Sequence, residues 1–274
     1  WGRLESLSLD WSVYGGDGVG EGFVVVPRGP YRRGGDSEAI DPLSTDQINV
    51  PSFAITRFPV TFRQYLGFLD ALAMRDPAEA ESRVPWLDDR GALAEIGPGG
   101  RYTPIADLMS PEVREQLYGE GAEWDLPIFG VEFEDGEAFC EWAAEQTGRP
   151  VRLPREDEWE KAARGMDRRP FPWGHWFDPT FCKSRLSRPY TPEPEPVGAF
   201  AADTSPYGVQ DLAGSVREWC DGWYSELEGL RVLRGGSWVD TDRRHRSASR
   251  GFYDPQAHRR LHGFRCAFDL PDPK

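Results

Sequence analysis

The sequence predicts a loop-rich fold built from short strands and a few helices. Thirty glycines and 24 prolines interrupt a chain of 274 residues, and 11 tryptophans are available to anchor its loops against a core. Apolar runs are short and end at glycine or proline, as strands and turns do. This combination fits such a fold better than a helical bundle or a doubly wound sheet. The length suffices for one large or two modest domains.

Short strands and one helix open the predicted fold. Residues 1–21 are rich in glycine and acidic side chains, and we expect a linker or leader there. Residues 23–27 indicate a short strand that ends at a proline, and residues 53–58 alternate like a second strand. Thr61 is a suitable N-cap for a helix over 62–73, which carries leucines along one face.

The middle of the chain is irregular and then helical. Residues 75–123 are broken by prolines and indicate an insertion, with short helices around 77–83 and 111–118. Longer helices are predicted over 134–147 and 156–164, each ended by a glycine. The acidic side chains at the start of the last helix are explained by the helix dipole rather than by a carboxylate site.

The stretch from residue 231 to residue 268 differs in character from the rest. Val232-Leu233 and residues 263–268 indicate short buried strands, and the polar, charged and aromatic residues between them follow neither a helical period nor an alternation. Gly235-Gly236 permits a sharp turn after the first strand. Two interpretations stay open: a solvated loop, or a ligand-facing surface fixed by a rigid scaffold.

The charge balance excludes some classes of partner. Acidic residues outnumber basic ones by 46 to 32, a net charge of −14, which argues against nucleic acid or an anionic membrane surface. No run approaches the roughly 18 apolar residues of a membrane span, and no signal peptide is evident. Residues 243–265, with seven arginines and three histidines, are the exception. This basic patch suits an anionic ligand or an acidic protein surface, although some arginines would pair with buried carboxylates.

The cysteines give no metal-binding spacing. Cys140, Cys182, Cys220 and Cys266 lie far apart and form no CxxC pair, which disfavours a zinc site. Scattered cysteines of this kind are typical of reduced thiols in an intracellular protein, so a cytoplasmic location is favoured. Because the chain begins at Trp1 rather than methionine, we expect it to derive from a longer protein, fused to other domains upstream.

Nine motifs follow one another along the chain: GFVVVPRG (22–29), FPVTFRQY (58–65), AFCEWA (138–143), RLPREDEWEKAARG (152–165), FPWG (171–174), SPYGV (205–209), DLAGSVREW (211–219), RGGSW (234–238) and GFR (263–265). Together and in this order they resemble the formylglycine-generating enzyme, or sulfatase-modifying factor, family. The resemblance implies a C-type-lectin-like α+β fold with short twisted antiparallel strands, two main helices and many structured loops, in one domain over 22–270. Residues 181–183 and 194–198 resemble members fused to bacterial serine/threonine kinases.

The resemblance does not carry over the oxidative activity of the family. Oxidising members bind copper and attack a substrate cysteine with two cysteines, five residues apart, in the loop after the GGS motif. Those positions are Asp240 and His245 in this chain. A carboxylate and an imidazole cannot replace thiolates that bind Cu(I) and exchange with a thiol. We therefore expect no formylglycine generation.

Two metal sites are weighed as alternatives. Calcium sites in the family use an asparagine-containing GNxWEW turn, which is GSVREW here; Ser215, Val216 and Glu218 could still supply oxygen ligands. The competing interpretation pairs Glu218 with a buried arginine. Asp240 and His245, with or without His258, have the ligand types of an oxygen-activating site. Sulfoxide synthases of the ergothioneine pathway contain related domains, but their iron ligands lie in a separate helical domain.

We predict a non-catalytic module that binds a protein or an anionic ligand through residues 238–262, and neither nucleic acid nor a membrane. Aromatic side chains in a polar loop make rigid recognition contacts. The predicted ligand-facing residues are Asp240, Asp242, Arg243, Arg244, His245, Ser249, Phe252, Tyr253, Asp254, His258, Arg259 and Leu261. A narrower form is a variable protein of a diversity-generating retroelement, whose hypervariable segment lies between GGSW and GFR. The alternatives are a metal-dependent oxidase or sulfoxide synthase, and a C-terminal sensor domain of a serine/threonine kinase.

Overall fold

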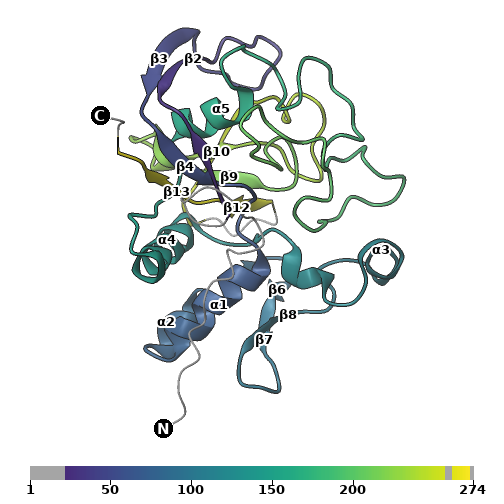
Figure 1. Ribbon diagram of the computed structural model, residues 1–274. Coiled ribbons are helices and arrows are strands. Elements are labelled where there is room, and N and C mark those ends of the chain that lie inside the picture. The colour runs from purple at the N-terminus through teal and green to yellow at the C-terminus, as the bar shows by residue number, and fades with distance from the viewer. Residues whose placement is uncertain (1–21, 257–260, 272–274) are drawn as a thin grey trace.

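The computed structural model describes residues 22–256 and 261–271, and the expected leader over 1–21 lies outside them. Two sheets, in the strand orders β1-β4-β13 and β11-β10-β9-β12, form its centre (Figure 1). Their strands are β1 (Phe23–Val26), β4 (Phe53–Thr56), β9 (Arg217–Ser225), β10 (Leu230–Arg234), β11 (Arg250–Tyr253), β12 (His262–Phe264) and β13 (Ala267–Asp269). Except for β12, which runs parallel to β9, these strands pair antiparallel. The predicted α+β class with short, mainly antiparallel strands is confirmed.

Three hairpins and five α-helices surround these sheets. The hairpins join β2 (Gly29–Arg33) to β3 (Asp46–Val50), β5 (Trp86–Leu87) to β6 (Gly91–Ala92), and β7 (Ala94–Ile96) to β8 (Tyr102–Pro104). The helices are α1 (Phe62–Ala73), α2 (Pro77–Ser82), α3 (Pro111–Val113), α4 (Phe133–Thr147) and α5 (Glu156–Arg164). A π-helical turn (Arg114–Tyr118) extends α3, and a 3-10 turn (Ala122–Asp125) follows. The hairpins were not predicted from the sequence.

The β1-β4-β13 sheet separates two hydrophobic clusters. Ala54 of β4 joins the cluster that contains α1 and α4, while Phe53 and Ile55 join the cluster that contains Trp159 of α5. Figure 1 shows α5 on one side of these strands and α4 with α1 on the other. Because side chains alternate between the faces of a strand, a strand covered on both faces is mainly apolar, and the buried hydroxyl of Thr56 in β4 donates to the carbonyl of Phe58 at 2.8 Å. The cover on both faces explains why every residue of β4 is buried.

The ends of the longer helices follow local chemistry. Thr61 caps α1 as predicted: its hydroxyl accepts from the backbone N–H of Gln64, and the Gln64 side chain accepts from the backbone N–H of Thr61. Gly148 ends α4 in the left-handed conformation that glycine tolerates best, with a φ of 66°. In the described part of the chain, no helix has both the length and the hydrophobicity of a membrane span.

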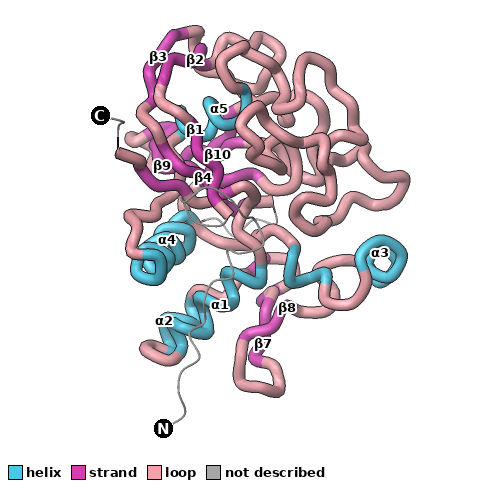
Figure 2. The backbone as a smooth tube through the Cα atoms, in the orientation of Figure 1, coloured by secondary structure: helices cyan, strands magenta, loops and turns pink. Residues whose placement is uncertain are grey.

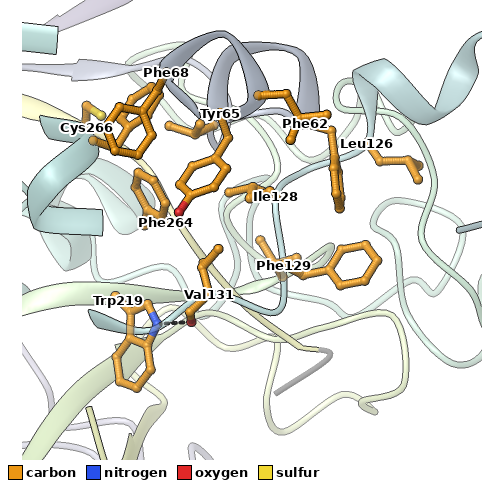
Figure 3. Close-up of a cluster of buried hydrophobic side chains, with 14 of the residues drawn as sticks. Phe62, Tyr65, Phe68, Leu126, Ile128, Phe129, Val131, Trp219, Phe264 and Cys266 are labelled. Carbon is orange, nitrogen blue, oxygen red and sulfur yellow. Dashed lines mark hydrogen bonds between the residues drawn. The ribbon is translucent and has the colours of Figure 1, made fainter. Parts of the chain in front are cut away.

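Aromatic side chains fill the core beneath α1. Tyr65 and Phe68 of α1 meet Phe139 of α4 and Phe264 of β12, with ring centroids between 5.4 and 6.3 Å apart. Figure 3 shows this cluster and, beside it, the indole of Trp219 donating a hydrogen bond of 3.2 Å to the carbonyl of Val131. Edge-to-face and offset contacts of this kind contribute beyond the apolar area they bury.

Loops account for the long connection between α5 and β9. Residues 165–216 contain no helix or strand, and Figure 2 shows them as an extended run of loop around one side of the molecule. A buried ion pair between Lys183 and Glu195 fixes this run, and Arg188 and Tyr118 also donate to the Glu195 carboxylate. The segments that resemble kinase-fused members are therefore structural in this fold.

All four cysteines are buried free thiols. Cys140 of α4 and Cys266 approach each other with 3.6 Å between their sulfur atoms. Burial raises the pKa of the Cys140, Cys182 and Cys220 thiols. Since the thiolate is the reactive form of cysteine, these side chains are held in their unreactive state away from solvent.

The predicted closing strand over 263–268 is corrected by the structure. It is two strands, because β12 pairs with β9 in one sheet and β13 pairs with β4 in the other. Arg265 and Cys266 form the crossing between them. An apolar run shows that a segment is buried, but it cannot show that the segment changes sheets in the middle.

Arg265 holds this crossing with a buried ion pair. Its Nε and Nη2 donate to both carboxylate oxygens of Glu218 at 2.6 and 2.7 Å, and Nη1 donates to the carbonyl of Thr56 at 3.0 Å. The indole N–H of Trp159 donates to the same carboxylate at 2.7 Å. Both charged side chains are fully buried. One ion pair thus joins β9, β4, α5 and the crossing.

Changing Glu218 to Gln tests how much the fold depends on this pair. The amide leaves the Arg265 guanidinium buried without a counter-charge, so we expect the free energy of unfolding to fall by roughly 3 kcal/mol. Urea denaturation measures this loss. The matched control is Glu226→Gln in the exposed turn between β9 and β10, which should change stability by less than about 0.5 kcal/mol. Equal stability of the two variants would show that the pair is dispensable.

Candidate functional site

A cavity of about 370 Å³ opens beside β11, within the predicted binding segment. Its lining combines side chains of β9, β10 and β11 with two residues from far upstream. The lining residues are Ile40, Asp41, Arg217, Leu230, Leu233, Arg244, Arg250, Gly251, Phe252, Tyr253 and Asp254. Four of the predicted ligand-facing residues, namely Arg244, Phe252, Tyr253 and Asp254, are therefore brought together here. A volume of this size is within the range of small-molecule sites.

Arg244 is the arginine of the cavity that forms no ion pair with a described residue. Its Nη1 donates to the carbonyl of Arg250 at 2.7 Å. Burial lowers the pKa of Arg244 below its usual value, as does the neighbouring positive charge of Arg217, while the negative charges of Asp240 and Asp41 act in the opposite direction. Arginine nevertheless remains charged in proteins. A half-buried guanidinium that forms no ion pair is an attractive position for an anion.

The other two arginines of the cavity, and Arg246 beside it, are held by carboxylates. Arg217 pairs with Asp240 at 2.6 Å, and Arg250 pairs with Glu156 at 2.5 Å. Arg246, outside the cavity, pairs with Asp36 at 2.9 Å and with Glu38. The basic patch predicted from the sequence is therefore largely neutralised. Among the described residues of the patch, Arg243 and Arg244 form no ion pair: Arg243 is exposed and donates to the carbonyl of Glu38, whereas Arg244 lines the cavity.

Two aromatic residues give the cavity an apolar wall. Phe252 is 45% exposed and stacks on Tyr224 with 4.2 Å between ring centroids. Tyr253 packs edge to face on His262 at 4.6 Å. Trp238 lies in the core against Phe129. An exposed ring beside a cation can contact the apolar part of a ligand whose anionic part meets the cation.

Three predicted ligand-facing residues are turned inward, and the prediction is corrected for them. Asp240 accepts hydrogen bonds from Arg217 and from the Ser237 backbone N–H at 2.9 Å. His245 is fully buried, and its Nδ1 bonds to the carbonyl of Ala213 at 2.7 Å. Ser249, also buried, donates to the carbonyl of Arg243 at 2.5 Å. A loop without periodicity gives no indication of which side chains face the core.

The remaining predicted residues have mixed positions. Asp242 and Arg243 are exposed, and Arg243 donates to the carbonyl of Glu38 at 2.9 Å. Leu261 is half-buried against the hydrophobic core. His258 and Arg259 lie outside the described residues. Asp242, Arg243 and Leu261 do not line the cavity.

Sequence reasoning missed several lining residues. Arg217 belongs to the DLAGSVREW motif, but nothing local indicates that its guanidinium turns toward the loop after GGS. Ile40 and Asp41 come from a segment about 200 residues upstream in sequence, and the backbone contact between Arg250 and Ile40 that brings them in is non-local. Only the tertiary fold shows these neighbours.

The model of the sulfatase-modifying factor enzyme 1-like domain family matches residues 17–270. The chain belongs to this family. It is 29% identical to the formylglycine-generating enzyme of Thermomonospora curvata, over 92% of this chain and 94% of that protein. It is 30% identical to the inactive C-alpha-formylglycine-generating enzyme 2 of Mus musculus, over 92% of this chain and 84% of that protein. Because both active and inactive relatives occur, membership alone does not decide activity.

Other relatives are parts of longer proteins. Hercynine oxygenase of Mycolicibacterium smegmatis is 32% identical, and the match covers 93% of this chain and 63% of that protein. Serine/threonine-protein kinase Pkn1 of Chlamydia trachomatis is 27% identical, and the match covers 90% of this chain and 38% of the kinase. The kinase-associated resemblance is thus supported.

Solved structures confirm the fold. PvdO from Pseudomonas aeruginosa superimposes with a TM-score of 0.65 at 23% identity, over 90% of this chain and 94% of PvdO. Treponema denticola variable protein 1 gives a TM-score of 0.65 at 16% identity, over 90% of this chain and 95% of that one. The architecture is the C-type-lectin-like fold of the formylglycine-generating-enzyme type. At these identities the likeness concerns the fold alone.

In the GSVREW turn, for which the sequence suggested calcium ligands, Glu218 is engaged within the protein. Both oxygens of Glu218 already accept from Arg265, and Trp159 adds a third donor. Ser215 and Val216 are buried in the same turn. Across residues 22–256 and 261–271, no three His, Cys, Asp or Glu side chains gather closely enough to hold a metal ion. The proposed calcium ligand Glu218 is corrected to an internal ion-pair partner.

Asp203 stabilises the turn at Ala213 and Gly214, against which His245 packs. Its buried carboxylate accepts from the backbone N–H groups of Ala213 and Gly214 at 3.0 and 3.2 Å, and the carbonyl of Ala213 in turn meets His245 and the N–H of Gly236. A side chain on Gly236 would lie 2.4 Å from the His245 ring, so the close approach requires glycine. Burial, and then repulsion from Asp211, raises the pKa of Asp203 to about 8.

The pH dependence of the stability of an Asp203→Asn variant tests this interaction. The folded state keeps a proton that the unfolded state loses near pH 4, so the stability from this proton is complete at low pH and disappears as pH rises through about 8. Asparagine keeps the acceptor oxygen and does not titrate. We expect the variant to gain about 4 kcal/mol of stability relative to the parent as the pH rises from 5 to 8, because the parent loses about 1.4 kcal/mol per pH unit over most of this range. Urea denaturation at both pH values measures the difference; a pH-independent difference would contradict the raised pKa.

Proposed function

We propose that this chain is a non-catalytic recognition module that binds the anionic group of a ligand, or of a partner protein, in the cavity beside Arg244. The observation that carries the proposal is the guanidinium of Arg244, which forms no ion pair with a described residue and lines a cavity of about 370 Å³. A guanidinium matches carboxylate and phosphate groups through parallel hydrogen bonds. Arg217 adds a second positive charge nearby, and Phe252 offers a partly exposed ring.

Several features support a role without catalysis. The two positions that carry thiols in oxidising members hold Asp240 and His245, and both side chains are engaged inside the protein. Burial lowers the pKa of His245, so its imidazole is neutral and stacks on Phe177 at 5.7 Å between centroids. The four cysteines present are buried elsewhere. Thiol chemistry would need an accessible thiolate, which this arrangement does not offer.

A narrower form of the proposal is a variable protein of a diversity-generating retroelement. It is supported by the exposed side chains of Asp242, Arg243, Phe252 and Asp254, which could change without disturbing the core. Sequencing the encoding locus across a population tests it, and a uniform segment over 238–262 would eliminate it.

The sensor domain of a serine/threonine kinase is a second candidate setting for the same binding role. The 27% identity to a Chlamydia trachomatis kinase, of which this chain spans 38%, favours it. The coding sequence upstream of Trp1 decides the matter, because a kinase carries a glycine-rich loop and an HRD motif.

Changing Arg244 to Gln tests the binding proposal. We expect phenyl phosphate to bind the parent protein, inorganic phosphate to bind more weakly because it lacks the ring, and phenol to bind weakest because it lacks the charge. The substitution should weaken phenyl phosphate at least tenfold, since about 1.4 kcal/mol corresponds to a factor of ten and hydrogen bonds to charged groups contribute more than that. Isothermal titration calorimetry at roughly 0.15 M salt measures the three affinities.

The matched control is Arg101→Gln, which removes an exposed arginine from the β7–β8 hairpin and should leave all three affinities unchanged. Phe252→Ala should weaken phenyl phosphate but not inorganic phosphate. Equal binding by the parent and Arg244→Gln would show that the cavity is not an anion site.

Metal content tests the enzymatic alternative. Because Asp240, His245 and Glu218 are engaged internally, we expect protein purified without added metal or chelator to hold far less than one equivalent of copper, iron or calcium. His245→Ala should leave that content unchanged. Elemental mass spectrometry gives the values. One equivalent of copper or iron that disappears in His245→Ala would reject the recognition module in favour of an oxidase.

A further inference from the structure

A second and larger hollow lies between the helices α1 and α2 and the β7–β8 hairpin. Its volume is about 680 Å³, and its lining comes from residues 73–102. Figure 1 shows this hairpin projecting beside α1, away from the two central sheets. The hairpin is fixed to the helix by a hydrogen bond of 2.8 Å from the Tyr102 backbone N–H to Asp70. The hollow, called here the α1–β7 groove, is therefore part of the folded structure.

The shape of the α1–β7 groove follows from the sizes of its side chains. Small residues, among them Ala73, Ala92 and Ala94, leave the space open. Larger apolar residues, Trp86 and Ile96, form its edges. A run of small side chains between large ones makes a concave surface that can receive apolar anchors from another molecule.

Its apolar edges are exposed to water. Trp86 is 46% and Ile96 67% exposed, and Met74, just beyond the groove, is 63% exposed. Burial of this surface against another molecule favours binding by about 25 cal/mol per Å² of apolar area. Isolated exposed apolar residues need no explanation, but a group of them around a groove marks an interaction surface.

The charges around the groove have one sign. Three carboxylates, those of Glu81, Asp88 and Glu95, line it, and it has no basic lining residue. None of the three forms an ion pair with a residue in the described ranges. Elsewhere in the same region the acidic residues Glu79 and Asp107 do pair with arginines. The groove therefore presents uncompensated negative charge next to apolar surface, which a positively charged partner would neutralise.

We propose that the α1–β7 groove binds an amphipathic helix of a partner protein, whose apolar face enters the groove and whose flanking lysines or arginines meet Glu81, Asp88 and Glu95. Helices bind to grooves of this kind through anchors at positions i, i+3, i+4 and i+7. The proposal is independent of the Arg244 cavity, which has the opposite local charge and lies on other elements.

The probe is a fluorescein-labelled 18-residue peptide that carries leucines at i, i+3, i+4 and i+7 and lysines at the flanking positions. One comparator replaces its lysines by glutamates, and a second scrambles its order. We expect saturable binding of the lysine peptide only, measured by fluorescence anisotropy with the full chain at roughly 0.15 M salt. Ile96→Asp should weaken this binding at least tenfold, and Arg244→Gln should not change it.

Charge reversal gives the second arm. Asp88→Lys/Glu95→Lys should transfer the preference from the lysine peptide to the glutamate peptide. The matched controls lie in the exposed turn between β9 and β10: Leu227→Asp, where the leucine is fully exposed, and Glu226→Lys/Glu228→Lys. Both controls should bind like the parent. All of these positions are exposed, so each variant should retain the thermal unfolding midpoint of the parent within a few degrees.

Several outcomes would overturn the proposal. Absence of saturable binding would remove the helix partner, and equal binding of the scrambled peptide would show that shape is not recognised. Equal losses of peptide binding in the control variants would show that the effect comes from the overall net charge of −14 and not from the groove. A dimer that light scattering detects in the parent but not in Ile96→Asp would assign the groove to a second copy of the chain instead.

Discussion

The pair between Glu218 and Arg265 is the constraint on which the rest of the structure depends. Taking two charges out of water is expensive, and the cost is recovered only when every donor and acceptor finds a partner. Arg265 meets this condition with Glu218 and with backbone carbonyls at 56–57 and 210–211. Those carbonyls belong to the end of β4 and to the loop that enters the Ser215 turn. The pair therefore positions both sheets and the loop that supports the cavity.

The two residues at the thiol positions, Asp240 and His245, also determine the electrostatics of the cavity. Asp240, at the first thiol position, binds Arg217 and fixes it close to Arg244. His245, at the second, is packed against the Ala213 carbonyl and cannot reach the cavity. The loop that would hold metal and thiols is thus braced internally. Arg244, which forms no ion pair with a described residue, lines the cavity together with Phe252, and the recognition role proposed above rests on this arrangement.

Local chemistry made part of this structure predictable. Thr61 and Gln64 form a capping box, and a glycine ends α4; both effects act within a few residues, so sequence suffices. The nine motifs indicated the family, and the family indicated the fold. The sheet change at Arg265 could not be predicted, because the pairing partners of β12 and β13 are remote in sequence. The same holds for the inward orientation of Ser249, which depends on its bond with the distant Ile40.

The two surfaces are governed by charge at different distances. At physiological ionic strength the screening length is about 8 Å, so the net charge of −14 acts mainly on the approach of a partner, whereas Arg244 acts within the cavity. An anion must therefore approach against the global field and is retained by a local charge. A basic helix approaching the α1–β7 groove is attracted by both the global field and the local carboxylates. Added salt weakens the repulsion of an approaching anion and the attraction of an approaching basic helix. Higher ionic strength should therefore raise the association rate of the anion and lower that of the helix.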